Sequence, residues 1–330
     1  MKKLVFVVAF MFLAVGLLGT PVLAKTRWNA NLAWPPKNHH CQAMLEYSKM
    51  VKDATKGDLD IVVNMGGALG YKGPELLKVV RDGLLPVSDM VISSVAGDAK
   101  IFQIVTLPFL CRDLKDAKLL TDIARPYFEK TAKKWKQKIL YIAPWPPTGF
   151  WSKQKIQTVE DMKGRKVRTY DKNGALLVKK LGGTPYALPF SEVYSSLATG
   201  LIDSVITSTS TAVDGKFWEV LKYFQRYNIT IATDMVNVNL RAFNKLDKKT
   251  QKILVDKGRE IEKMIWARVA TLDKEKEAEC NKKGIESTKV SPAMLKALRK
   301  ASESIHKNWL KSAPKDAVKI YKEFKAKAGD

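Results

Sequence analysis

The sequence predicts an α/β protein of two lobes bridged by a long helix, and three observations support this fold class. Short β-rich runs alternate with segments of helical period along the chain, as in α/β folds with largely parallel strand pairing. The 330 residues are 46% hydrophobic, enough for one large or two medium cores. Residues 247–283 contain no proline and repeat apolar residues at helical spacing. As a helix they would span roughly 50 Å, longer than a small domain.

The first 24 residues are predicted to be an export signal. Lys2 and Lys3 precede an apolar run that is followed by small residues ending at Ala24. The apolar run is shorter than the roughly 20 residues that a transmembrane helix needs, and no second run follows. We therefore expect cleavage near Ala24 and an exported chain that begins near Lys25, with no lipid anchor and no membrane span.

The net charge is strongly positive. The chain has 57 Lys and Arg against 33 Asp and Glu, a balance of +24, and loss of the two leader lysines leaves 55 − 33 = +22. A cytoplasmic nucleic-acid binder would not be exported, so no nucleic acid is expected as a partner. The basic surface either serves solubility or attracts anionic small molecules or an acidic partner. The lysines are scattered along helical faces, which favours the first interpretation.

The β-rich runs and the helical segments can be placed in order along the chain. Strands are predicted before Trp34 and at residues 59–64, 89–93, 139–143, 166–168 and 204–207. Helices are predicted at residues 114–123 and 175–181, along the bridging segment, from the Ser291-Pro292 pair onward, and around residues 318–324. We expect residues 25–148 with about 237–275 to form lobe I, and about 149–236 with 276–330 to form lobe II.

Catalytic and metal-binding motifs are not found in the sequence. It lacks G-x-S-x-G, G-x-G-x-x-G and the phosphate-binding P-loop pattern. The only histidines are His39, His40 and His306. Two of them are adjacent and the third is distant, so no metal site and no cofactor is predicted. The cysteines, Cys41, Cys111 and Cys280, have no C-x-x-C spacing and allow at most one disulfide of undetermined pairing.

Aromatic residues and prolines gather instead at predicted strand-to-loop junctions, where open α/β sheets bind ligands. Trp34 and Trp145 each precede two prolines, and Phe150 lies in the same loop as Trp145. Core packing is the alternative for each ring, but the prolines keep them out of central strands and favour a pocket wall. Arg168 ends a predicted strand, where its guanidinium can take a carboxylate through two parallel bonds. An ordinary surface arginine is the alternative there.

Three ordered segments carry a resemblance to a known family. They are Glu-Asp-Met-Lys-Gly-Arg-Lys-Val-Arg at 160–168, Leu-Gly-Gly-Thr-Pro at 181–185, and Pro-Phe-Ser-Glu-Val-Tyr-Ser-Ser-Leu-Ala-Thr-Gly-Leu-Ile-Asp at 189–203. Together they closely resemble the signature of DctP-type substrate-binding proteins of TRAP transporters, and weaker similarity extends over nearly the whole mature chain. The resemblance implies a two-lobed periplasmic binding protein. It would act as a monomer that closes on an organic acid and delivers it to an ion-gradient-driven permease, without ATP or catalysis.

The resemblance also implies roles for particular residues. Arg168 takes the place of the family's carboxylate-binding arginine, and Phe190 that of its cleft aromatic. Where many members have a ligand-contacting amide this chain offers Thr207 or Ser208, and aromatic residues replace a basic residue in the 145–151 loop. We therefore expect an aromatic or hydrophobic monocarboxylate, such as an indole or phenyl acid or an aromatic amino acid. The expected ligand contacts are Arg168, Trp34, Trp145, Phe150, Phe190, Tyr170, Ser93, Thr207, Ser208 and His39.

Three other functions stay open at this point. The same fold would serve a C4-dicarboxylate or another organic acid. An exported enzyme acting on an organic acid would need a base, for which Glu75 or Glu192 is available. A ligand sensor that presents its acid to a receptor kinase would have the same sequence features.

Overall fold

The structure is a computed structural model that describes residues 25–329, so the predicted leader lies outside the described residues. The helices are α1 (His39–Ala54), α2 (Leu76–Asp82), α3 (Leu114–Lys134), α4 (Lys172–Lys180), α5 (Val193–Ala198), α6 (Thr209–Asp214), α7 (Leu240–Asn244), α8 (Lys248–Lys282), α9 (Pro292–Ser312) and α10 (Lys315–Ala328). Short 3-10 helices are η1 (Gly73–Glu75), η2 (Ile92–Val95), η3 (Lys100–Thr106), η4 (Glu160–Met162), η5 (Phe190–Glu192) and η6 (Phe217–Glu219). Within residues 25–329, no helix is long and apolar enough to cross a membrane.

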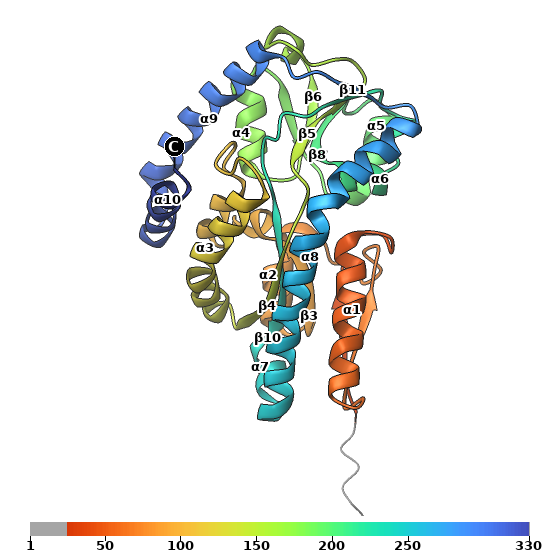
Figure 1. The fold of residues 1–330 in the computed structure, drawn as a ribbon, viewed down its shortest axis with the longest axis vertical. Helices are drawn as coiled ribbons and strands as arrows, with labels where there is room; N and C mark the ends of the chain where they lie inside the picture. Colours follow the sequence, from red (N-terminus) through yellow and green to blue (C-terminus); the bar gives the residue numbers. More distant parts are fainter. Residues whose placement is uncertain (1–24, 330) are drawn as a thin grey trace, which may run out of the picture.

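Two sheets form the centres of two lobes (Figure 1). The first sheet has the order β2-β1-β3-β10-β4, from β1 (Thr26–Asn31), β2 (Leu59–Asn64), β3 (Val87–Val91), β4 (Gln137–Pro144) and β10 (Thr233–Asn239). The second has the order β11-β9-β5-β8-β6-β7, from β5 (Thr148–Ser152), β6 (Lys166–Thr169), β7 (Thr184–Ala187), β8 (Ser204–Ser208), β9 (Tyr223–Gln225) and β11 (Glu286–Thr288). The predicted two-lobed α/β fold is confirmed.

Both sheets are mixed, whereas the alternation of strands and helices predicts largely parallel pairing. Strand β10 runs antiparallel to β3 and β4, and β5 runs antiparallel to β8 and β9. These are the two strands that the chain enters directly after crossing from the other lobe. Parallel neighbours need a crossover, usually a helix, that carries the chain back to the end of the sheet where the first strand began. The chain reaches β5 and β10 through a short crossing segment instead, so each runs in the opposite direction to its neighbours.

The two crossing segments, residues 145–147 and 226–232, run side by side between the lobes. The backbone N–H of Trp145 donates to the carbonyl of Ala232 at 2.9 Å, and that of Thr148 donates to the carbonyl of Thr230 at 2.9 Å. The hydroxyls of Thr148 and Thr230 also lie 2.9 Å apart. A narrow double crossing of this kind is a typical hinge, because a few backbone dihedrals change while both lobes stay rigid.

Helix α8 is the third link between the lobes, and it runs along both of them in Figure 1. Its first half packs on β4 so closely that a Cβ at Gly258 would lie 2.4 Å from the carbonyl oxygen of Leu140. Glycine is therefore required at this position. Its second half is held by the second lobe, because Asp273 accepts from Arg226 at 2.6 Å and from Thr209 at 2.8 Å. The predicted bridging helix is confirmed.

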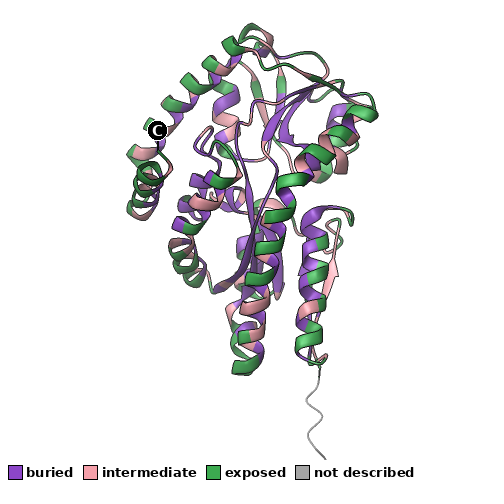
Figure 2. Ribbon diagram, viewed as in Figure 1, coloured by how far each residue is buried: buried purple, intermediate pink, exposed green. Residues whose placement is uncertain are grey.

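The buried residues lie on both sheets and on the helix faces that cover them (Figure 2). The C-terminal helices contact both lobes, since α9 packs against α4 and α10 packs against α3. The predicted division assigns residues 276–330 to lobe II, and the structure gives this segment contacts with lobe I as well. The three cysteines are buried free thiols.

Candidate ligand-binding site

A small cavity lies between the lobes beside the hinge. It is lined by Trp34, Val91, Trp145, Thr148, Arg168, Tyr170, Phe190, Thr207, Ser208, Thr211 and Ala232. Its free volume is about 40 Å³, whereas one water molecule needs roughly 10–15 Å³. In this closed form the cavity therefore holds the equivalent of a few water molecules.

The first lobe supplies an aromatic wall, which consists of Trp34 after β1 and Trp145 after β4. Their ring centroids lie 4.6 Å apart at an interplanar angle of 71°, an edge-to-face contact. Phe190, from η5 of the second lobe, lies 5.6 Å from the Trp34 ring. This aromatic contact crosses the cleft, so it forms only when the lobes are close together.

Two buried carboxyl groups hold the indole rings in place. The Nε1–H of Trp34 donates to Oδ1 of Asp89 at 3.0 Å, and that of Trp145 donates to Oδ1 of Asp234 at 2.7 Å. Burial is the main cause that raises the pKa of Asp234 well above its ordinary value, and repulsion from the nearby Asp89 carboxyl group is the second. The orientation of the aromatic wall is therefore fixed by the first lobe itself, before any ligand enters.

The second lobe supplies a cationic wall, which consists of Arg168 with the hydroxyls of Thr207 and Ser208. Arg168 is 4% exposed, and burial lowers its pKa to about 10, so it stays charged at neutral pH. Its Nε–H donates to the carbonyl of Leu188 at 2.9 Å. Within the described residues its terminal amino groups have no hydrogen-bond partner, so both N–H forks remain for an incoming carboxylate.

Hydroxyl groups line the rest of the cavity. Ser208 caps α6 by accepting from the backbone N–H of Thr211, whose hydroxyl lies 3.1 Å from its own. The phenol of Tyr170 lies 2.8 Å from the hydroxyl of Thr230, and burial raises its pKa, so it stays neutral. These groups can donate to a ligand oxygen or accept from a ligand N–H.

Seven of the ten residues expected to contact ligand line this cavity, and Phe150, Ser93 and His39 do not. Phe150 is fully buried in the core against Tyr227, with ring centroids 6.0 Å apart. Ser93 is buried beside the Asp171 carboxyl group. His39 lies behind the wall, where its Nε2 is 3.2 Å from the carbonyl of Pro144 and its ring contacts Trp145.

Sequence reasoning missed four lining residues, Val91, Thr148, Thr211 and Ala232. Thr148 lies in the aromatic 145–151 loop that the sequence singles out, and Thr211 follows Ser208 by three residues, about one helical turn. Val91 and Ala232 carry no distinguishing signal, because an apolar lining residue looks like any core residue.

The cavity wall is suited to binding. Of the described residues that line it, none is a histidine, a cysteine or a carboxylate. One buried cation, aromatic faces and hydroxyls can hold a carboxylate at one end and a flat or apolar body at the other. Closing the lobes around such a ligand removes both ends from water.

Two polar contacts join the lobes outside the cavity. The amide of Asn38, which caps α1, donates to Oδ2 of Asp214 at the end of α6 at 2.6 Å. Nζ of Lys72 lies 2.9 Å from Oε1 of Glu192. Burial raises the pKa of Asp214 to about 7, against the opposing effects of Asn38 and Lys276. Both contacts exist only when the lobes are closed.

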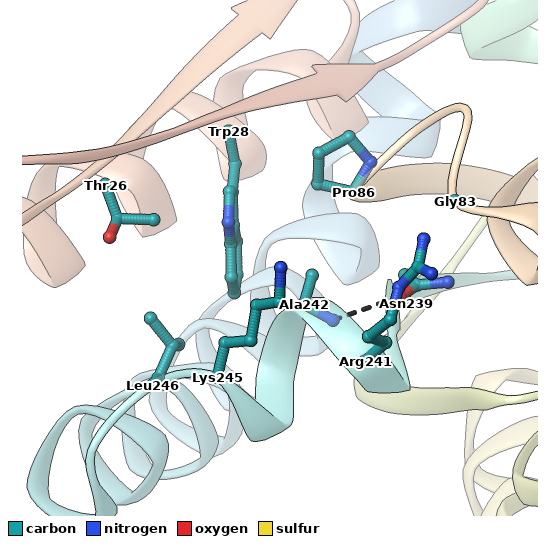
Figure 3. A pocket seen from close by; sticks show the side chains of 9 residues that line it. All are labelled: Thr26, Trp28, Gly83, Pro86, Asn239, Arg241, Ala242, Lys245 and Leu246. Carbon is teal, nitrogen blue, oxygen red and sulfur yellow. Dashed lines mark hydrogen bonds between the residues drawn. The ribbon is translucent and has the colours of Figure 1, made fainter.

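A second cavity, of about 260 Å³, lies at the far end of the first sheet (Figure 3). Its buried amide, Asn239, already donates to the carbonyl of Val80 and accepts from the N–H of Ala242. Its charged groups are Arg241 and Lys245, which are exposed. It is a basic surface hollow whose charged groups are exposed and whose buried amide is already hydrogen-bonded, so the interlobe cavity is the better candidate.

Two lobes joined by a narrow double crossing, with a small cavity between them, define the chain as a bilobal solute-binding protein. The family model of the DctP proteins, described as bacterial extracellular solute-binding protein family 7, matches residues 30–312. The chain belongs to this family, as the sequence signature predicts. Proteins of the family bind small organic acids for transport and deliver them to membrane permease components.

Solved structures and curated relatives are similar over most of the chain. A Bordetella pertussis extracytoplasmic solute receptor binding pyroglutamic acid is 26% identical, with a TM-score of 0.87 over 90% of this chain and 99% of that one. A marine metagenome TRAP solute-binding protein specific for pyroglutamate is 27% identical, with a TM-score of 0.88 over 92% and 99%. The 2,3-diketo-L-gulonate-binding periplasmic protein of Escherichia coli is 25% identical, over 66% of this chain and 67% of its own.

Proposed function

We propose that the protein is a periplasmic TRAP solute-binding protein that captures a small flat monocarboxylate by closing its two lobes. The observation that carries this proposal is the single buried guanidinium of Arg168 facing the aromatic wall across a small cavity. In this account Arg168 binds the carboxylate, Trp34 and Trp145 cover the body of the acid, and the hydroxyls of Thr207 and Ser208 contact its polar edge.

The cavity favours one carboxylate over two. Arg168 is its only cationic lining residue among those described, so a second carboxylate would be buried without a partner, at a cost of several kcal/mol. A sugar acid would place many hydroxyls against indole and phenyl faces, which offer no acceptors. A flat ring or a short apolar chain instead gains the full contact with the aromatic wall.

The size of the cavity narrows the choice among monocarboxylates. The closed cavity, at about 40 Å³, is smaller than the roughly 150 Å³ cavity that holds benzene, so the lobes must part slightly around any ring acid, and a single-ring acid needs less opening than an indole acid. The pyroglutamate-binding relatives, at 26% and 27% identity, support a small ring that carries one carboxylate. We therefore place phenyl acids and pyroglutamate ahead of indole acids and aromatic amino acids.

Capture is a shift of population between open and closed forms. The closed form alone joins the aromatic and cationic walls and makes the Asn38–Asp214 and Lys72–Glu192 contacts. A ligand that bridges both walls stabilises this form and leaves unchanged when the lobes open. Both walls of the cavity come from one chain, so a monomer is sufficient, and a membrane permease is the partner that receives the acid.

The test is a thermal-shift series on protein that has been unfolded and refolded to remove any carried ligand. The panel is pyroglutamate, phenylacetate, indole-3-acetate, phenylalanine, succinate and glucuronate, each at a concentration far above its dissociation constant. A ligand at 100 times its dissociation constant stabilises the native state by about 2.7 kcal/mol. We expect single-ring monocarboxylates to raise the melting temperature and to be recovered chemically unchanged. A rise with succinate or glucuronate alone would contradict the proposed substrate class.

A further inference from the structure

Three buried side chains converge behind the aromatic wall, outside the ligand cavity. They are His40 at the start of α1, Asp89 on β3 and Asp234 on β10. Nδ1 of His40 lies 3.6 Å from Oδ2 of Asp89 and 3.8 Å from Oδ2 of Asp234. One ligand atom of each residue lies within 4.8 Å of the others. These separations are too long for hydrogen bonds, so the three groups do not satisfy one another.

The cluster is almost completely withdrawn from solvent. His40 is 1%, Asp89 3% and Asp234 0% exposed. Within residues 25–329, neither ring nitrogen of His40 and neither Oδ2 oxygen has a hydrogen-bond partner. Buried polar atoms are nearly always paired, and buried carboxylates are paired with a cation or coordinate a metal. A partner bound among the two nitrogens of His40 and the two Oδ2 oxygens would satisfy these atoms together.

The opposite oxygen of each carboxyl group is already engaged. Oδ1 of Asp89 accepts from the indole N–H of Trp34, and Oδ1 of Asp234 accepts from that of Trp145. Each carboxyl group thus has one oxygen bound to a tryptophan and one oxygen turned toward His40. Hydrogen bonds to the outer oxygen of a carboxylate ligand are the usual way in which proteins orient a metal ligand.

We propose that His40, Asp89 and Asp234 bind a divalent transition-metal cation, of which Zn²⁺ is the first choice and Mn²⁺ the second. One imidazole nitrogen and two carboxylate oxygens are a ligand set that both ions accept. A doubly charged ion also balances two buried carboxylates. With bonds of roughly 2.0–2.2 Å, ligand atoms around such an ion lie about 3–3.5 Å apart. The separations of His40 from the two carboxyl oxygens, 3.6 and 3.8 Å, therefore need to shorten by a few tenths of an ångström, and the widest separation in the cluster, which is within 4.8 Å, by up to about 1.5 Å.

The position of the cluster decides what such an ion would do. All three residues belong to the first lobe, so the site is complete in both the open and the closed form. The ion does not reach the ligand cavity, because the two indoles lie between them. By fixing both aspartates it fixes both rings of the aromatic wall, and so it acts as a structural support for ligand recognition. Reasoning from histidines alone missed the site, because two of its ligands are carboxylates on separate strands.

The experiment uses the chain from Lys25 without an affinity tag, refolded in the presence of a chelator and then dialysed. Zinc chloride and, separately, manganese chloride are titrated by calorimetry, and bound metal is counted by mass spectrometry after gel filtration. No organic acid is added, so the result is independent of the proposed substrate. We expect one equivalent of metal and a change in tryptophan fluorescence as the ion binds next to the aspartates of the aromatic wall.

Matched variants identify the ligands. Asp234→Asn keeps the size of the side chain and an acceptor for Trp145 but removes one metal ligand, and His40→Gln removes another. We expect each to lower metal affinity by at least about tenfold. His306→Gln is the control, because His306 lies outside the cluster and contacts the carbonyl of Pro108.

Two results would overturn the proposal. One is wild-type protein that binds less than half an equivalent of either metal at micromolar concentration, which needs no variant and holds even if the variants fold poorly. The other is metal binding by His40→Gln that equals that of His306→Gln in proteins of equal melting temperature. A bridging water would be the remaining partner for the four buried atoms in either case.

Discussion

The two walls of the cavity differ in chemistry, one aromatic and one cationic, although both have carboxyl groups behind them. Behind the aromatic wall, Asp89 and Asp234 accept the indole N–H groups, and the rings screen these acids from the ligand. Behind the cationic wall, Asp171 lies near Arg168 but makes no hydrogen bond to it, so the guanidinium keeps its terminal N–H groups for the ligand. Under the proposed function, one lobe recognises shape and the other recognises charge. A ligand must therefore contact both lobes, which couples recognition to closure.

Removing the charge should have the largest effect. Arg168→Ala leaves the ligand carboxylate buried without a partner, and we expect a loss of about 2–4 kcal/mol of binding free energy, roughly 30- to 1,000-fold in affinity. Titration calorimetry with the best acid of the panel measures it. Arg165→Ala is the control, because Arg165 bonds to the carbonyl of Asp161 and to Gln154 outside the cavity. Equal affinity of the two variants would disprove the carboxylate role.

Removing one ring of the aromatic wall should have the next largest effect. Trp34→Ala deletes the face that contacts Phe190 across the cleft, and we expect a loss of about 1–3 kcal/mol for ring acids. Trp34→Phe keeps an aromatic face and should lose less. Trp266→Phe is the control, because Trp266 donates to the carbonyl of Ile142 from α8. If aliphatic and ring acids lost affinity equally, the aromatic wall would not select for shape.

The Asn38–Asp214 contact predicts a pH dependence. The pKa of Asp214 is raised to about 7 by burial, whereas an unfolded aspartate has a pKa of about 4. The folded state thus binds this proton more tightly, and its contribution to stability falls as the pH rises from about 4 to 7 and is constant above. Against Asp214→Asn, wild-type protein should lose up to about 4 kcal/mol of unfolding free energy over this range in denaturant unfolding, since one unit of pKa difference corresponds to about 1.4 kcal/mol.

Asn38→Ala tests the sign of that effect. The Asn38 hydrogen bond opposes the rise in the pKa of Asp214, so its removal should move the transition to higher pH. A difference between wild-type protein and Asp214→Asn that does not vary with pH would show that the carboxyl group is solvated in the closed form.

The exposed contact at the mouth of the cleft should have the smallest effect. Lys72 and Glu192 are 44% and 48% exposed, so their pair contributes about 0.2–1 kcal/mol to closure. Lys72→Ala should weaken ligand affinity by less than about fivefold, and the difference should vanish in 0.5 M salt. Lys78→Ala is the control, because Lys78 is an exposed lysine that pairs with Asp98 within the first lobe. An effect of Lys72→Ala as large as that of Trp34→Ala would contradict this ranking.

The parts of the fold with strong local signals were predictable from the sequence. The bounds of β2 agree with the predicted 59–64, α8 covers the predicted proline-free stretch, and Ser291 caps α9 in front of Pro292. Strands β5, β7, β9, β10 and β11 were not predicted. They are short or carry polar residues such as Asp234, and their pairing is set by tertiary contacts that no local pattern encodes.

The candidate site divides in the same way. Arg168 was singled out at a strand end, and Trp34 and Trp145 beside prolines, and all three line the cavity. Phe150 lies in the same aromatic segment as Trp145 but faces the core. Alternate residues of a strand face opposite sides of the sheet, and the sequence of this segment does not show which side Phe150 faces. The cluster of His40, Asp89 and Asp234 joins three elements far apart in sequence, which only the fold brings together.

The most direct test of the division of roles is a cycle of four calorimetric titrations. Wild-type protein and Arg168→Ala are each titrated with the acid that gives the largest thermal shift and with its uncharged primary amide. If Arg168 binds the carboxylate, the binding free energy of the acid should weaken by about 2–4 kcal/mol in the variant. The amide should bind both proteins weakly and about equally. If the amide binds wild-type protein as tightly as the acid does, or loses as much in the variant, recognition of charge by the second lobe is contradicted.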